Sequence, residues 1–181
     1  MRIIAGEWRG RKLSAPKGDG TRPTADRTRE TLFSMLTSRL GSFEGLQVAD
    51  LFAGSGALGL EALSRGAAYC LFVEQEAEAL KAIRGNIEML DARAQTSVQA
   101  GSVTALGPAK AAYDLLLLDP PYGTGAGAVA LDRMLRLGWI GPVTWIAVET
   151  SAKESVEVKG LKIEAERKVG KARLILLTPL D

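Results

Sequence analysis

The chain contains no histidine and only one cysteine among its 181 residues. Without an imidazole, Ser-His-Asp and Cys-His nucleophiles and nearly all zinc sites are excluded, so we expect no metal centre. The single Cys70 excludes an intramolecular disulfide. It lies in an apolar run, which favours a buried structural thiol. Whatever chemistry the protein performs must therefore run without an imidazole.

Long apolar runs are also missing. No stretch reaches the roughly 18 apolar residues that span a bilayer, and residues 1–7 lack the apolar segment of a secretory signal. We therefore expect a cytoplasmic protein without membrane contact. The chain is nevertheless 46% hydrophobic, which is enough for the core of one domain.

The charge is unevenly distributed along the chain. Residues 1–22 carry six basic and two acidic groups, a net charge of +4, whereas residues 23–150 carry a net charge of −4 and residues 151–181 one of +2. A basic N-terminal arm on an acidic body favours a surface for nucleic-acid phosphates. An ordinary solvated edge is the alternative.

Strand and helix signals alternate from about residue 46. This rhythm predicts an α/β fold with a doubly wound parallel sheet, and the last two segments predict an antiparallel hairpin. The expected strands are 46–52, 68–74, 96–100, 113–119, 143–149, 161–168 and 172–178, and the expected helices are 57–64, 76–90 and a segment ending near 137.

The first forty residues differ from this pattern. Residues 2–5 and 11–14 predict a small hairpin, and Thr24 or Asp26 is expected to cap a helix that ends near Leu40. We therefore divide the chain into a basic hairpin extension at 1–20 and an α/β domain at 21–181.

The most informative segment is Asp119-Pro120-Pro121-Tyr122, directly after four leucines at 115–118. Each proline fixes φ, removes a backbone donor and keeps the preceding residue out of the helical region. The chain is thus held extended where it leaves the sheet, and it presents a carboxylate, carbonyls and an aromatic ring. These groups suit a flat ring that carries an amine. All four residues are candidate catalytic residues, and a plain proline turn is the alternative.

A glycine-rich motif at 50–59 lies where the first strand of the sheet gives way to a helix. Gly54 and Gly56 permit a tight turn, and the Glu74 carboxylate, at the end of the next strand, can take both hydroxyls of a ribose. The spacing also fits the dinucleotide fingerprint, so a nicotinamide cofactor and S-adenosylmethionine compete. S-adenosylmethionine has no phosphate and calls for an acid near the loop start, such as Asp50, either for the amino-acid end of the cofactor or for holding the loop. Hydride transfer has no use for the acceptor-lined aromatic segment, so the pattern favours S-adenosylmethionine.

In this order and spacing, Asp50–Gly59, Glu74 and Asp119–Tyr122 resemble a class I S-adenosylmethionine-dependent methyltransferase that acts on an exocyclic amine. Three further segments narrow the resemblance to the RsmD family, whose members are bacterial enzymes that methylate guanine N2 in small-subunit (16S) ribosomal RNA. These segments are Arg2–Leu13, Arg22–Phe33 and Phe52–Arg65. The resemblance covers nearly the whole chain.

The resemblance implies a seven-stranded sheet, a methionine end of the cofactor near residues 22–33, and a hairpin that faces RNA. The expected partner is ribosomal RNA in a small-subunit particle, and the protein is expected to be a monomer. Many enzymes of this class hold the adenine through an acid where this chain has Ser102. The implied cofactor-binding residues are Asp50, Phe52, Ala53, Gly54, Ser55, Gly56, Glu74, Gln75, Ser102, Arg22 and Thr24, and the implied RNA-binding residues are Arg2, Arg9, Arg11 and Lys12.

We expect the Asp119 carboxylate and the Pro120 carbonyl to accept the two hydrogens of the target amine. Tyr122 would stack on a base swung out of its helix or loop, and the glycine-rich loop at 123–127 would close over it.

Other functions are possible for the same motifs. An adenine-N6 DNA methyltransferase is the main alternative, because Asp-Pro-Pro-Tyr suits an adenine amine equally well. A non-catalytic RNA-binding module would be expected to lack key residues of the cofactor-binding loop, whereas Asp50, Gly54 and Gly56 are all present here. A nicotinamide oxidoreductase fits least well.

Overall fold

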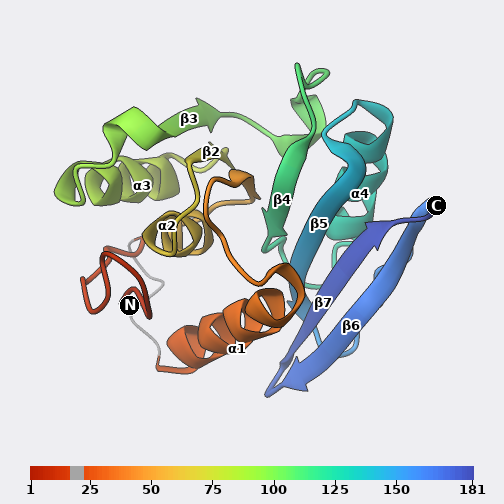
Figure 1. The fold of residues 1–181 in the computed structure, drawn as a ribbon, viewed down its shortest axis with the longest axis horizontal. Helices are drawn as coiled ribbons and strands as arrows, with labels where there is room; N and C mark the ends of the chain where they lie inside the picture. The colour runs from red at the N-terminus through yellow and green to blue at the C-terminus, as the bar shows by residue number, and fades with distance from the viewer. Residues whose placement is uncertain (17–22) are drawn as a thin grey trace.

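The computed structural model describes residues 1–16 and 23–181. Its centre is a seven-stranded sheet in the order β3-β2-β1-β4-β5-β7-β6 (Figure 1). Neighbouring strands are parallel from β3 to β5, whereas β7 runs antiparallel to both β5 and β6. The predicted seven-stranded sheet with its antiparallel end is confirmed. The strands are β1 (Gln47–Leu51), β2 (Tyr69–Glu74), β3 (Thr96–Ala100), β4 (Tyr113–Leu118), β5 (Ile140–Ser151), β6 (Leu161–Val169) and β7 (Ala172–Pro179).

Helices cover both faces of the sheet. Successive side chains of a strand point to opposite faces: Leu115 and Leu117 of β4 join a core with α1, α2 and α3, whereas Leu116 and Leu118 join a core with α4. All four leucines are fully buried, as expected for a central strand of a parallel sheet. The helices are α1 (Pro23–Leu40), α2 (Ala57–Ser64), α3 (Ala77–Met89) and α4 (Ala126–Arg136), with two short 3-10 helices, η1 (Arg93–Gln95) and η2 (Val103–Ala105). Within the described ranges, none of these helices has the length and apolar character to cross a bilayer.

The N-terminal arm, residues 1–16, packs against the same face as α1 and α2 (Figure 1). Its side chains Ile3, Trp8 and Leu13 are buried in the core that these helices share. The arm approaches α2 so closely at Gly6, where φ is +90°, that a Cβ there would lie 1.9 Å from the carbonyl oxygen of Ser64. Only glycine fits this contact, so the arm docks against α2 through its backbone.

One buried carboxylate joins the arm to two helices. Glu61 of α2 accepts hydrogen bonds from the amides of Ile4 and Ala5 at 2.9 and 3.1 Å. The same carboxylate pairs with Arg29 of α1 and Arg65 at 3.4 and 2.9 Å. Glu61 is fully buried, so its negative charge is stabilised by these hydrogen bonds and ion pairs in place of water. Removing one partner of a buried ion pair destabilises a fold by about 3–5 kcal/mol.

Most predicted elements lie within one or two residues of those observed, and three details were wrong. Helix α1 begins at Pro23, so Thr24 and Asp26 lie inside its first turn instead of capping it; proline is favoured at this position because its missing N–H has no helical partner there. Strand β5 is longer than predicted at both ends. Gly127, assigned to a loop, lies in α4. The predicted N-terminal hairpin is present, but as one antiparallel bridge, between Arg2 and Lys12.

Candidate active site

The candidate site lies at the carboxyl ends of β1, β2, β4 and β5. The order of the strands reverses at β1, which has β2 on one side and β4 on the other. In an open α/β sheet, ligands bind in the crevice outside such a switch point. Both sequence motifs follow strands that end there, the glycine loop after β1 and Asp119–Tyr122 after β4.

The glycine loop between β1 and α2 is held in place from below by Asp50. Its Oδ2 accepts a hydrogen bond from the amide of Gly59 at 2.9 Å. The side chain is fully buried, and its Oδ1 has no hydrogen-bond partner among the described residues. Burial raises the pKa of this carboxyl well above its ordinary value. The structure thus places Asp50 underneath the loop, where it lines neither of the two cavities of the site.

Glu74 holds the same loop from the side. Its Oε1 accepts a hydrogen bond from the amide of Gly54 at 2.8 Å, and its Oε2 accepts from the amides of Gln75 and Glu76, both at 2.9 Å. Three backbone donors therefore fix the carboxylate at the end of β2. A carboxylate has about four lone-pair positions, so one held in this way can still accept a ligand hydroxyl.

A first cavity of about 310 Å³ opens beside this carboxylate, and we call it the Glu74 cavity. It combines apolar walls with polar groups from the ends of β2, β3 and β4. Ser102 contributes to it, and its hydroxyl also accepts a hydrogen bond from the amide of Thr104 at 3.2 Å, at the start of η2. The residues around the cavity are Phe52, Gly54, Val73, Glu74, Gln75, Glu76, Gly101, Ser102, Val103, Asp119 and Pro121.

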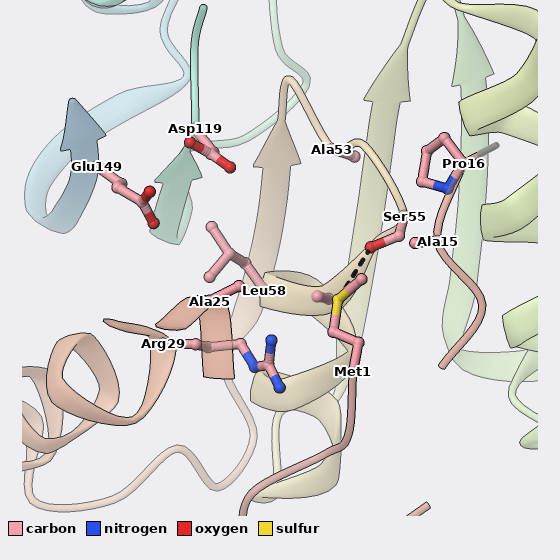
Figure 2. A pocket seen from close by; sticks show the side chains of 11 residues that line it. Met1, Ala15, Pro16, Ala25, Arg29, Ala53, Ser55, Leu58, Asp119 and Glu149 are labelled. Carbon is pink, nitrogen blue, oxygen red and sulfur yellow. Dashed lines mark hydrogen bonds between the residues drawn. The ribbon is translucent and has the colours of Figure 1, made fainter. Parts of the chain in front are cut away.

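A second cavity of about 280 Å³, the Glu149 cavity, shares Asp119 with the first (Figure 2). In this view the carboxylates of Asp119 and Glu149 lie on one side of Leu58, and the guanidinium of Arg29 lies on the other. Met1 reaches the wall and accepts a hydrogen bond from Ser55 at 3.6 Å. The residues around the cavity are Met1, Ala15, Pro16, Ala25, Arg29, Ala53, Ser55, Ala57, Leu58, Asp119 and Glu149.

Asp119 lines both cavities, whereas Tyr122 is tied to Glu149. The Tyr122 hydroxyl donates a hydrogen bond to Glu149 Oε2 at 3.2 Å. Burial, reinforced by the Glu149 carboxylate, raises the pKa of this phenol far above its ordinary value, so it remains a donor. Burial also raises the pKa of Glu149. Tyr122 is 48% exposed as a residue, which leaves area for a planar ligand.

The loop that follows Tyr122 is held by Glu154. Its carboxylate accepts hydrogen bonds from the amides of Gly123 and Gly125 at 2.9 and 3.1 Å, and from the Thr150 hydroxyl at 2.7 Å. These bonds, the one from Gly123 first, lower the pKa of Glu154. These hydrogen bonds thus hold the loop at 123–127 against the end of β5. That this loop closes over a base stays a prediction.

The structure brings most of the predicted site residues to the two cavities and leaves others outside them. Gly56, Pro120 and Tyr122 adjoin lining residues but do not line either cavity themselves. Arg22 lies outside the described residues, and Thr24 is in the first turn of α1. The predicted residues that line a cavity are Phe52, Ala53, Gly54, Ser55, Glu74, Gln75, Ser102, Asp119 and Pro121.

The four predicted RNA-binding residues lie on the surface of the arm. Arg2, Arg9, Arg11 and Lys12 are all exposed. Arg2 Nη1 donates to the carbonyl of Gly10 at 3.0 Å, and Arg11 Nη2 donates to a carbonyl at the end of α3 at 3.1 Å. These bonds hold two of the basic side chains against the surface.

Sequence reasoning missed Arg29, Glu149 and Glu154. Arg29 lies inside a segment that the sequence associated with the cofactor, but it was not singled out. The only sequence signal for Glu149 was its position at the end of an expected strand. Nothing in the spacing indicated Glu154, whose partner Gly123 is 31 residues away.

The family model described as "Conserved hypothetical protein 95" matches residues 1–178. Ribosomal RNA small subunit methyltransferase D of Escherichia coli K12 is 36% identical over 156 residues, which are 86% of this chain and 77% of that protein. The putative rRNA methyltransferase YlbH of Bacillus subtilis is 37% identical over 126 residues, 67% of each chain.

Solved structures agree with these relatives. The putative methyltransferase yhhF from Escherichia coli superposes with a TM-score of 0.84 at 33% identity, covering 99% of this chain and 97% of that one. The putative methylase HI0767 from Haemophilus influenzae superposes with a TM-score of 0.82 at 30% identity, covering 99% and 98%. The resemblance inferred from the motifs is confirmed, and the chain belongs to the RsmD family of methyltransferases.

Proposed function

We propose that this protein transfers a methyl group from S-adenosylmethionine to the exocyclic N2 amine of a guanine in small-subunit ribosomal RNA. The observation that carries the proposal is the position of Asp119, which lines both cavities. A cofactor that extends through both cavities would bring its methyl group to this carboxylate, where the target amine would meet it. The ribosomal RNA methyltransferases among the relatives support the class of substrate.

The residues around the Glu74 cavity fit the adenosine part of the cofactor. The Glu74 carboxylate, fixed by three backbone amides, suits the two hydroxyls of a ribose. Phe52, Val103 and Pro121 supply apolar walls for an adenine ring, and Ser102 supplies a hydroxyl at its rim. Because this chain has Ser102 where many related enzymes have an acid, the adenine amine would rely on the Ser102 hydroxyl and on backbone carbonyls.

The same geometry disfavours a dinucleotide. The amide of Gly54, the loop donor that a pyrophosphate would need, already donates to Glu74. Glu74 and Asp119 both line this cavity, and their carboxylates would repel a pyrophosphate. S-adenosylmethionine has no phosphate and meets no such repulsion.

The methionine end of the cofactor fits the Glu149 cavity, where Arg29 supplies a positive charge and Ser55 a hydroxyl for a carboxylate. Arg29 is buried and held by Asp26 and Glu61 at 3.1 and 3.4 Å, so its guanidinium is fixed before any ligand binds. A charge held in advance needs little reorganisation, and this favours binding.

When bound, S-adenosylmethionine supplies an electrophilic methyl group on a positively charged sulfur. The protein must orient the amine for an in-line attack and increase its nucleophilicity. The Asp119 carboxylate and the Pro120 carbonyl would accept the two amine hydrogens, which favours a pyramidal nitrogen and stabilises its developing positive charge. Tyr122, fixed through its hydroxyl, would stack on the extruded base.

The exposed cations of the arm would bind RNA phosphates beside this site. Arg9 and Lys12 have exposed side chains, and the arm that carries them also lines the Glu149 cavity through Ala15 and Pro16. Phosphate contacts of this kind fix the position of an RNA without reading its sequence. Such a substrate would put the reaction in the cytoplasm, on a ribosomal particle.

Methyl transfer to isolated ribosomal subunits tests the proposal. Small subunits from cells that lack this protein are incubated with the enzyme and tritiated S-adenosylmethionine, and the modified nucleotide is mapped. We expect one N2-methylguanine in the small-subunit RNA. Label in an adenine, or in DNA offered under the same conditions, would favour the adenine-N6 alternative, and no label in any nucleic acid would overturn the proposal.

A further inference from the structure

Asp119 directly follows β4, and Glu149 lies at the same level in β5, the neighbouring parallel strand. Leu118 of β4 pairs with Val148 of β5, and the next residue along the chain from each is one of these two acids. Both side chains reach the Glu149 cavity, and they lie on the same side of Leu58 (Figure 2). The site therefore presents two adjacent carboxylates, whereas the proposed methyl transfer uses only that of Asp119.

Glu149 is placed to meet a ligand. Arg29, the cation in the same cavity, directs its hydrogen bonds to Asp26, Glu61 and the carbonyl of Arg2. The Tyr122 hydroxyl uses one lone pair on Oε2 of Glu149. A carboxylate offers about four such positions, so this bond orients Glu149 without exhausting its capacity to accept.

Two adjacent carboxylates can accept hydrogen bonds from the N1–H and N2 amine edge of guanine, but they do not match the N1 and N6 amine edge of adenine. Guanine carries an N1–H beside its N2 amine, which makes two neighbouring donors on one edge. Adenine carries an unprotonated N1 beside its N6 amine, so a carboxylate that met this N1 would place two lone pairs against each other. A site built to accept a particular donor rejects an analogue that lacks it, because the acceptor is left buried and unpaired.

We propose that Glu149 accepts the N1–H of the target guanine while Asp119 takes the N2 amine, which makes Glu149 the residue that selects guanine over adenine. The inference rests on the proposed function of the site. No bond forms or breaks at Glu149, which acts only as a hydrogen-bond acceptor. The Tyr122 hydroxyl sets this acceptor and the stacking ring relative to each other, so a base stacked on Tyr122 would present its edge to Glu149.

A 2-aminopurine substitution tests this directly. The base keeps the amine of guanine but has a lone pair at N1 in place of the N1–H. Small subunits are reconstituted with 16S RNA that carries either guanine or 2-aminopurine at the mapped target, and kcat/KM is measured for each. We expect the wild-type enzyme to favour guanine by at least about 100-fold. Equal rates on the two substrates would overturn the proposal without any variant.

The Glu149→Gln variant should reverse this preference in part, because its side-chain amide can donate to the N1 lone pair. We expect the ratio of the two kcat/KM values to fall at least about tenfold, with cofactor affinity by calorimetry unchanged within about twofold. Glu157→Gln removes an exposed acid outside both cavities and should leave the ratio unchanged.

Other outcomes separate the explanations. A Glu149→Gln enzyme with weaker cofactor affinity and an unchanged ratio would assign Glu149 to the cofactor. One that binds the cofactor but methylates neither base would equally contradict a role in selection. If the wild-type enzyme leaves guanine-bearing subunits unmodified, the proposed function itself fails, and this result is distinct from a failure of the inference.

Discussion

Glu154 accepts a hydrogen bond from the amide of Gly123 at 2.9 Å, and this bond ties the loop that follows the proline motif to the end of β5. The loop leaves the site directly after Tyr122, so its position affects the ring that is expected to stack on the base. One acid thus supports the base side of the candidate site from a position 31 residues away in the sequence.

The hold of Glu154 on the loop should depend on pH. Its pKa in the folded protein is lowered from 4.5, first by the hydrogen bond from Gly123. A lowered pKa means that the stabilisation is fully present above 4.5 and is lost as the pH falls through the folded value. We expect the amide resonances of Gly123 and Gly125 to shift together in an NMR titration below pH 4.5. Glu154→Gln should abolish that shared transition; an unchanged titration in the variant would show that another group is responsible.

Asp119 should be required for catalysis and not for cofactor binding. Asp119→Ala removes the acceptor for the target amine, and we expect methyl transfer to fall by about 100-fold or more. Asp119→Asn keeps one acceptor and should lose less. Calorimetry should show that both variants bind S-adenosylmethionine with affinity close to that of the wild type. Full activity in Asp119→Ala would contradict the mechanism.

Asp50 should lower the stability of the fold as the pH rises. Its folded pKa is raised well above 3.8 by burial, so above pH 3.8 the carboxyl ionises first in the unfolded chain. This favours unfolding progressively until the folded pKa is reached. Asp50→Asn keeps an acceptor for the Gly59 amide but does not ionise. The free energy of unfolding of the variant, relative to that of the wild type, should therefore increase between pH 4 and pH 8 in urea titrations.

A matched variant separates the contribution of the Gly59 hydrogen bond to stability from that of the Asp50 charge. Asp50→Ala leaves the Gly59 amide without its partner, and a buried unsatisfied donor costs about 1–3 kcal/mol. We expect this variant to be less stable than Asp50→Asn at every pH. Equal stabilities would show that the bond to Gly59 contributes nothing.

The basic arm should contribute electrostatically to RNA binding. Arg9→Ala combined with Lys12→Ala should reduce affinity for small-subunit RNA. The magnitude of the negative slope of log K against log[salt] should decrease by about 0.7–0.9 for each RNA phosphate that the arm no longer neutralises. Lys168→Ala combined with Lys171→Ala removes two exposed cations at the turn between β6 and β7 and serves as the control. Equal reductions in both double variants would assign the effect to net charge. Substitution is preferable to deletion of the arm, because Ile3, Trp8 and Leu13 are part of the core.

The motifs located the site because its residues follow strands that the hydrophobic pattern makes plain. Four leucines in succession can only be a buried segment, and Asp119 comes directly after them. Once β4 and β1 are neighbours, the glycine loop and the proline motif must meet at one edge of the sheet. The family and the fold that the motifs indicated are therefore confirmed.

What the sequence did not indicate depends on pairing and side-chain direction. Glu149 is one acid among many until β5 pairs with β4 and brings it beside Asp119. Asp50 and Glu74 read alike in sequence, as acids at strand ends, yet one is buried beneath the glycine loop and the other opens into a cavity. The docking of the arm on Glu61 joins residues 57 apart, which no local pattern encodes.

Strand β6 forms one outer edge of the sheet, and no strand in the described part of the chain pairs with the outer side of its nine residues. Such an edge is a template for aggregation unless its side chains prevent it. Here Lys162, Glu166, Arg167 and Lys168 are all exposed, so a second strand that approached this edge would have to desolvate several charges. The C-terminal hairpin thus completes the sheet with a strand that is poorly suited to recruit another, which opposes assembly into continuous β structure at high protein concentration.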